Sequence, residues 1–271
     1  TEIMKKELNA FHDIEEEKIF VGGIAHWDVY FNGRLNVRSK NEVRMEIGQN
    51  SNGKILLYCT SAPVLFKSTF DVIETILDGI EKSCFSVPVQ LLVRLHPSYL
   101  FLLKNGGEVQ VIDQYKHRME VMERKYNGIL SFNLPRVEVA KDDVYFPSDD
   151  IKRLGELLTH SDVLLTEYST LMIEGAIFDL PVINVALKNF RDMDKPTSYV
   201  EEFAHLRRIL KIGFTRQAYN KDQLFKHINS YLLNPSLDVS ARKKLVNQEI
   251  TTNIGHAGES IGKYIYSLIE H

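Results

Sequence analysis

The chain has 271 residues, with 33 lysines and arginines against 36 aspartates and glutamates and a net charge of −3. Because neither sign forms a long block, this composition argues against a nucleic acid or an anionic membrane as the main partner. Only two cysteines occur, without a CxxC pair, which argues against a disulfide framework or a structural zinc site and favours a reducing cytoplasm.

Residues 1–17 form an acidic, helix-like stretch that opens on threonine rather than methionine. We interpret them as an N-terminal helical lead or interdomain linker of a longer protein, and residues 18–270 as a single domain. No apolar run approaches the length of a membrane span, and the polar start lacks the apolar segment of a signal peptide.

From residue 18 onward, short apolar runs alternate with longer segments of helical period. The runs predict strands over 19–21, 54–58, 89–94, 129–131, 163–165 and 181–185, with a possible seventh strand over 209–214. Helical spacing predicts helices over 70–82, 114–124, 149–159 and 170–178, then 221–233, 237–249 and 259–270. Wholly apolar strands between amphipathic helices predict an α/β fold, a Rossmann-like doubly wound parallel sheet. We expect the C-terminal helices to wrap back over it, and the loop 188–199 to be a functional segment.

In doubly wound folds, ligands bind beyond the carboxyl ends of the strands, so polar residues at those ends are candidates for a site. The run 19–21 ends in Gly22-Gly23, which lets the backbone pass close to a ligand or another chain, although a tight turn explains it more simply. The run 54–58 ends in a loop with Thr60 and Ser61, whose hydroxyls can donate to an anion.

Arg94 and His96 lie two residues apart at the end of an apolar run, just before Pro97, so their side chains share a face. A cation beside an imidazole suits a phosphate or carboxylate group. Equally, Arg94 can pair with an acid at the edge of the core while His96 caps a loop.

The run Thr166-Glu167-Tyr168-Ser169-Thr170 leads from a buried strand into a helix. Ser169 or Thr170 can cap this helix, whose free N–H groups and positive dipole end suit a pyrophosphate. Glu174 follows on nearly the same helical face, where a carboxylate can accept both hydroxyls of a ribose. Taken alone, the run is explained more simply as a capped helix with an exposed acid.

Together these stretches resemble the nucleotide-binding C-terminal domain of GT-B-type enzymes. The resemblance rests on Arg94-Leu95-His96-Pro97, the run 161–170 with Glu174, and Pro181-Val182-Ile183. It is closest to the CDP-glycerol glycerophosphotransferases of teichoic-acid synthesis and to capsule-polysaccharide glycosyltransferases, and more distant to UDP-GlcNAc 2-epimerases. Residues 21–28 and 253–261 resemble the "vtGnprfD" and "dGkaseRI" motifs of the same families.

The resemblance implies a bacterial transferase that moves a sugar or a polyol phosphate from a UDP- or CDP-linked donor, with no metal or other cofactor. It implies that His96 and Arg94 are catalytic. The nucleotide-binding residues that it implies are Thr60, Ser61, Glu167, Ser169, Thr170, Glu174, Gly258 and Glu259. It further implies an N-terminal acceptor domain in the parent chain and a cytoplasmic location. It leaves open whether the protein attaches to the inner face of the membrane, near a lipid-linked acceptor.

The sequence also departs from these families. Glu167 stands where they usually have Asp, and His256 and Ser260 replace the Asp and the basic residue of the C-terminal motif. Two alternatives remain: a non-catalytic α/β module that binds a protein or a phosphorylated metabolite, and a domain like the 2-epimerases. The epimerases usually carry a "DSGG" turn. In this sequence, Tyr168 and Thr170 replace residues of that turn.

Overall fold

The computed structural model describes residues 1–48, 53–63, 65–66, 69–101, 109–136, 138–140, 143–145, 147–187, 200–201 and 203–270. The predicted functional loop 188–199 lies outside the described residues. In the described ranges, no helix is long and apolar enough to cross a membrane.

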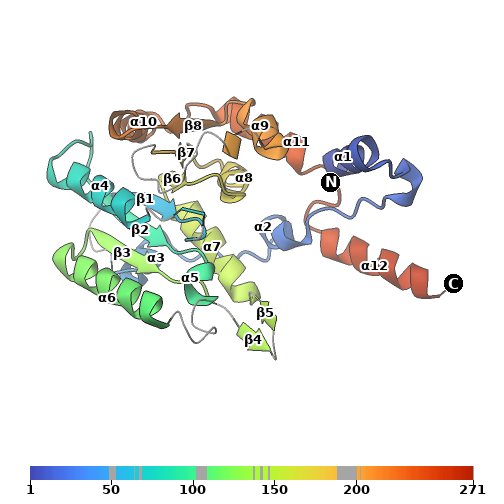
Figure 1. Cartoon of the computed structure of the whole chain (residues 1–271), viewed down its shortest axis with the longest axis horizontal. Coiled ribbons are helices and arrows are strands. Elements are labelled where there is room, and N and C mark those ends of the chain that lie inside the picture. Colours follow the sequence, from blue (N-terminus) through green and yellow to red (C-terminus); the bar gives the residue numbers. More distant parts are fainter. Residues whose placement is uncertain are drawn as a thin grey trace.

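A six-stranded parallel sheet forms the centre of the molecule (Figure 1). Its strands are β1 (Lys54–Cys59), β2 (Val89–Arg94), β3 (Leu130–Asn133), β6 (Val163–Thr166), β7 (Val182–Val185) and β8 (Thr215–Ala218). Their order is β3-β2-β1-β6-β7-β8, so the winding of the chain reverses between β1 and β6. The Rossmann-like doubly wound fold is therefore confirmed, and its topological switch point, where ligands bind in such folds, lies between these two strands.

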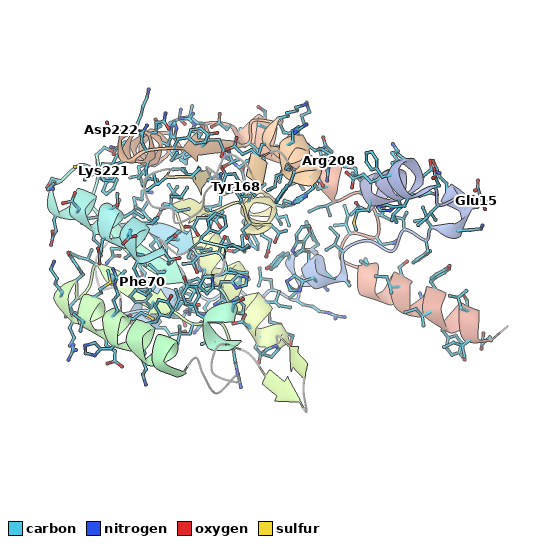
Figure 2. The ribbon with its side chains drawn as sticks, viewed as in Figure 1. Glu15, Phe70, Tyr168, Arg208, Lys221 and Asp222 are labelled. Atoms are coloured by element: carbon cyan, nitrogen blue, oxygen red, sulfur yellow. The ribbon has the colours of Figure 1, made fainter. Side chains whose placement is uncertain are left out.

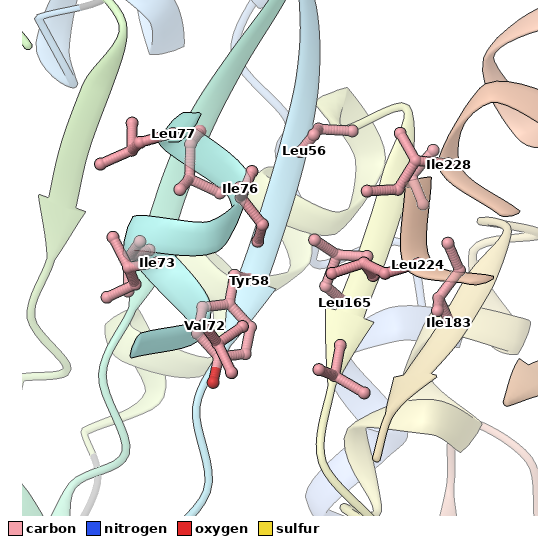
Figure 3. Close-up of a cluster of buried hydrophobic side chains, with 14 of the residues drawn as sticks. Leu56, Tyr58, Val72, Ile73, Ile76, Leu77, Leu165, Ile183, Leu224 and Ile228 are labelled. Atoms are coloured by element: carbon pink, nitrogen blue, oxygen red, sulfur yellow. The ribbon is translucent and has the colours of Figure 1, made fainter. Parts of the chain in front are cut away.

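Helices cover both faces of the sheet. One face carries α4 (Thr69–Glu81), α6 (Val109–Lys125) and α10 (Lys221–Leu233). The other carries α3 (Lys40–Glu46), α7 (Ser148–His160), α8 (Leu171–Ile177), α9 (Ala204–Leu210) and α11 (Val239–Glu249). Alternate residues of β1 enter the two cores, because successive side chains of a strand point to opposite faces. Figure 3 shows the first core, to which α4 contributes Ile73 and Ile76 and β1 contributes Leu56.

The remaining elements are short or peripheral. The short ones are η1 (Glu16–Lys18), η2 (Ala25–Trp27), α2 (Asp28–Phe31), α5 (Ser98–Phe101) and the antiparallel pair β4 (Glu138–Ala140) and β5 (Asp143–Tyr145). The helices α1 (Glu2–His12) and α12 (Ala257–Ile269) lie at one end of the molecule, away from the sheet (Figure 1).

Two predicted strands are wrong. Residues 19–21 form no strand and instead contact α12, where the Phe20 and Tyr264 rings stack with centroids 3.9 Å apart. A Cβ added at Gly22 would come within 2.3 Å of Ile261, so the glycine permits close approach to this helix. The predicted strand 209–214 is displaced, because α9 continues to Leu210 and β8 begins only at Thr215. As an edge strand, β8 (TRQA) lacks the apolar run that marks the central strands.

Candidate functional site

A cavity of about 150 Å³ lies beyond the carboxyl ends of β1 and β2, beside the switch point. Cys59, Thr60, Arg94 and His96 line it from these strand ends. The other lining residues come from η2, α7, α8 and two loops: His26, Leu95, Pro97, Pro135, Asp150, Ile151, Leu154 and Leu171. A larger hollow of about 650 Å³ lies at the amino ends of β2 and β3, but none of its described lining residues carries a charge. We therefore take the smaller cavity as the candidate site.

Arg94 is buried and already engaged. One guanidinium nitrogen lies 2.6 Å from a carboxylate oxygen of Asp150, and another donates to the side-chain oxygen of Asn133. The second oxygen of Asp150 accepts from the backbone N–H of Arg136 at 2.7 Å. The geometry thus matches the ion-pair alternative for Arg94, which joins β2 to α7 and to the end of β3 while still lining the cavity.

His96 is half-buried and held by two hydrogen bonds. Its backbone N–H donates to the Thr60 hydroxyl at 2.9 Å, and its Nδ1 accepts from the backbone N–H of Ser98 at 3.1 Å. Burial lowers the pKa of His96, which favours the neutral ring. With Nδ1 accepting, a neutral ring carries its proton on Nε2, so Nε2–H is the group that can donate to a ligand.

Glu167 lies behind the loop that follows β1. Its carboxylate accepts from the Tyr58 hydroxyl at 2.7 Å and from the backbone N–H of Ser61 at 3.1 Å, and its side chain is buried. The Ser61 hydroxyl in turn donates to the Glu167 carbonyl at 2.5 Å. Burial and the nearby carboxylate raise the pKa of Tyr58 well above its usual value. These contacts fix the position of the Thr60 and Ser61 loop.

The turn between β6 and α8 is anchored to β7. Tyr168 has a φ of 44°, in the left-handed region, and its backbone N–H donates to the side-chain oxygen of Asn184 at 2.6 Å. In Figure 2 this tyrosine lies in the middle of the molecule, far from Glu15 in the outlying part. The Ser169 hydroxyl accepts from the backbone N–H of Leu171 at 3.2 Å, whereas Thr170 is exposed at the helix start.

Glu174 is buried, not an exposed acid of the first turn. Its carboxylate accepts from the Tyr30 hydroxyl of α2 at 2.6 Å. Burial raises the pKa of Glu174, because a low-dielectric environment disfavours the charged form. Tyr30 is 144 residues away from Glu174 in the chain, so no local sequence signal indicates this contact.

Gly258 and Glu259 lie at the start of α12. The Asp28 carboxylate caps this helix by accepting from the backbone N–H groups of Ala257 and Gly258, at 2.9 and 2.8 Å. Glu259 is exposed and pairs with Lys263 at 2.6 Å. Asp28, two residues from His26, thus connects the start of α12 to the segment that lines the cavity.

The structure therefore gathers part of the predicted set around one cavity. Thr60, Arg94 and His96 line it, and Ser169 and Thr170 adjoin its lining residue Leu171. The others lie behind the loop after β1 (Ser61, Glu167), under the η2 and α2 segment (Glu174), or on α12 (Gly258, Glu259). Within the described residues, no group of three or more His, Cys, Asp or Glu side chains is arranged to hold a metal ion.

No protein-family model matches the sequence, and no curated protein matches it. Solved structures do match. The wall teichoic acid polymerase TagF, as its H444N variant, aligns over 98% of this chain and 57% of its own, with 18% identity and a TM-score of 0.61. The S. aureus MnaA–UDP complex aligns over 100% and 58%, with 14% identity and a TM-score of 0.56. The UDP-GlcNAc 2-epimerase of Methanocaldococcus jannaschii, in complex with UDP-GlcNAc and UDP, aligns over 92% of this chain and 59% of its own. The identity is 16% and the TM-score is 0.50.

The chain spans 57 to 59% of the length of these matched structures. At identities of 14 to 18%, the likeness concerns the fold. It agrees with the strand order and with the resemblance seen in the sequence motifs. The chain has the Rossmann-like α/β fold of GT-B enzymes.

Proposed function

We propose that this chain is the donor-binding domain of a bacterial surface-polysaccharide transferase that uses a nucleoside-diphosphate donor. The observation that carries the proposal is the cavity beside the switch point, where the His96 imidazole and the Thr60 hydroxyl lie at the strand ends near the start of α8. Ligands of doubly wound folds bind at this place. The likeness in fold to a teichoic acid polymerase and to a UDP complex supports the same choice.

The proposed chemistry is the transfer of a sugar or a polyol phosphate, in which negative charge grows on the phosphate of the leaving nucleotide. Hydrogen-bond donors fixed in advance stabilise such a charge. In our proposal, the Nε2–H of His96 and the hydroxyls of Thr60 and Thr170 are these donors. The buried pair of Arg94 with Asp150 holds the wall of the cavity in place.

We further propose that a second domain of the parent protein brings the acceptor to this site. The chain corresponds to 57% of the matched polymerase structure, which leaves room for another domain in proteins of that kind. In addition, α12 exposes several apolar side chains, among them Ile265 at 52%, Leu268 at 62% and Ile269 at 76%. Such a face is typical of a surface that another domain covers.

Isothermal titration of the chain with UDP, CDP, UDP-GlcNAc and CDP-glycerol tests the proposal. We expect one or more of these to bind, and the variant His96→Ala to weaken that binding about tenfold, the value of a lost charge-assisted hydrogen bond. His117→Ala, at an exposed position of α6, is the matched control and leaves affinity unchanged.

If none of the four compounds binds, the proposed function is refuted. A different outcome is also informative. If the chain converts UDP-GlcNAc to its C2 epimer without an acceptor, the activity is that of a 2-epimerase rather than a transferase. Proton NMR of the sugar nucleotide distinguishes these outcomes.

A further inference from the structure

We infer that His26 is a second anion-binding residue of this site and contacts the phosphates of the bound nucleoside diphosphate. The inference deepens the proposed function and rests on it. It starts from the lining of the cavity, in which His26 of η2 lies together with His96 and Thr60.

The other polar groups of the cavity are largely engaged within the protein. The guanidinium of Arg94 is neutralised by Asp150 and also bound to Asn133. Nδ1 of His96 accepts from a backbone N–H, which leaves one nitrogen of that ring for a ligand. A diphosphate carries several acceptor oxygens and more than one negative charge, so these donors alone match it poorly.

His26 supplies a further hydrogen-bond donor for the diphosphate. Its side chain is exposed, and within the described part of the chain no hydrogen bond or ion pair engages it. Partial burial lowers the pKa of His26, which favours the neutral ring before a ligand binds. A bound phosphate favours the imidazolium form instead, in which both ring nitrogens donate. A phosphate between His26 and His96 would receive hydrogen bonds from two different elements, η2 and the loop after β2.

The segment that carries His26 is rigidly attached to the rest of the domain. The adjoining Trp27 is buried, and Asp28 accepts two backbone hydrogen bonds from the start of α12. Tyr30 donates to the buried Glu174 at 2.6 Å. Among these anchored residues, His26 is the one with an exposed side chain at the cavity. A group held in this way binds a ligand with little further loss of conformational entropy.

Titrations that compare nucleotides with nucleosides test the inference. The full chain is titrated with UDP and CDP by calorimetry and with uridine and cytidine by protein NMR. We expect His26→Ala to weaken binding of the diphosphate about tenfold or more, as expected for one charge-assisted hydrogen bond, and to leave binding of the nucleoside unchanged. His26→Arg, which places a cationic hydrogen-bond donor at this position, should recover most of the diphosphate affinity.

His117→Ala serves as the control, and thermal melting of each variant checks that the exposed substitution leaves the fold intact. Equal affinity of wild type and His26→Ala for the diphosphate would overturn the inference alone. An equal loss for diphosphate and nucleoside would also overturn it, since the contact would then not be to phosphate. If the wild-type chain binds none of UDP, CDP, UDP-GlcNAc and CDP-glycerol, the proposed function fails and the inference fails with it.

Discussion

At the scale of single residues, the structure shows what Glu167 contacts at a position where the families that the sequence resembles usually have Asp. The side chain spans the distance between β6 and two groups of β1 and its following loop, the Tyr58 hydroxyl at 2.7 Å and the Ser61 N–H at 3.1 Å. We predict that Glu167→Asp lowers the free energy of unfolding by about 1–3 kcal/mol. The shorter carboxylate cannot reach both donors, so a buried phenol or N–H loses its partner. Urea denaturation followed by circular dichroism measures the change.

A double-mutant cycle with Tyr58→Phe separates this contact from general strain. If the hydroxyl is the partner that Asp fails to reach, the double variant should be less destabilised than the sum of the two single variants. Strict additivity would instead mean that Glu167 acts through Ser61 alone. The sequence marked Glu167 as unusual but gave no indication of Tyr58, because a tyrosine within an apolar strand carries no sign of its hydrogen-bond partner.

At the scale of elements, α12 depends on a cap supplied from the other end of the chain. Asp28 satisfies the backbone N–H groups of Ala257 and Gly258, and most of the helix beyond them is exposed. We predict that Asp28→Ala destabilises the first turn of α12 by about 1 kcal/mol, the usual value of a lost N-cap. Hydrogen exchange should then accelerate in residues 257–261. Asp222→Ala, at an exposed first-turn position of α10, is the control. Unchanged exchange in α12 would show that the cap contributes nothing.

The same scale shows what the sequence can and cannot predict. The central strands were predictable because both faces of each are covered, which requires continuous apolar runs. The edge strand β8 was not predictable, because its sequence is polar. The run 19–21 was mistaken for a strand, because three apolar residues do not reveal whether they face a sheet or a helix. The positions of His96 and Thr60 at strand ends, where both line the candidate cavity, were predictable from the sequence. The burial of Glu174 was not predictable, because it depends on residues that approach it only in the folded chain.

At the scale of the whole molecule, a buried carboxylate ties the N-terminal segment to the sheet domain. Glu156 of α7 accepts from the Arg38 side chain at 2.9 and 2.8 Å and from its backbone N–H at 3.1 Å, and Arg153 adds a contact at 3.0 Å. The hydrogen bonds from Arg38 lower the pKa of Glu156 from 4.5 to about 2. Folding therefore favours the charged form of this residue, and the stability that it contributes must depend on pH.

The sign of this dependence follows from the lowered pKa. The contribution of Glu156 is fully present above pH 4.5, its ordinary value, and is lost as the pH falls toward 2. We predict that Glu156→Gln lowers the free energy of unfolding by about 1–2 kcal/mol at pH 7, an amount that allows for solvent screening at the partly exposed Arg38. The difference from wild type should shrink between pH 4.5 and 2. Urea titrations at several pH values measure it, with Glu74→Gln, whose exposed side chain pairs with Arg118, as the control. A difference that stays constant down to pH 2 would contradict a charged Glu156, because a loss of shape or packing does not titrate.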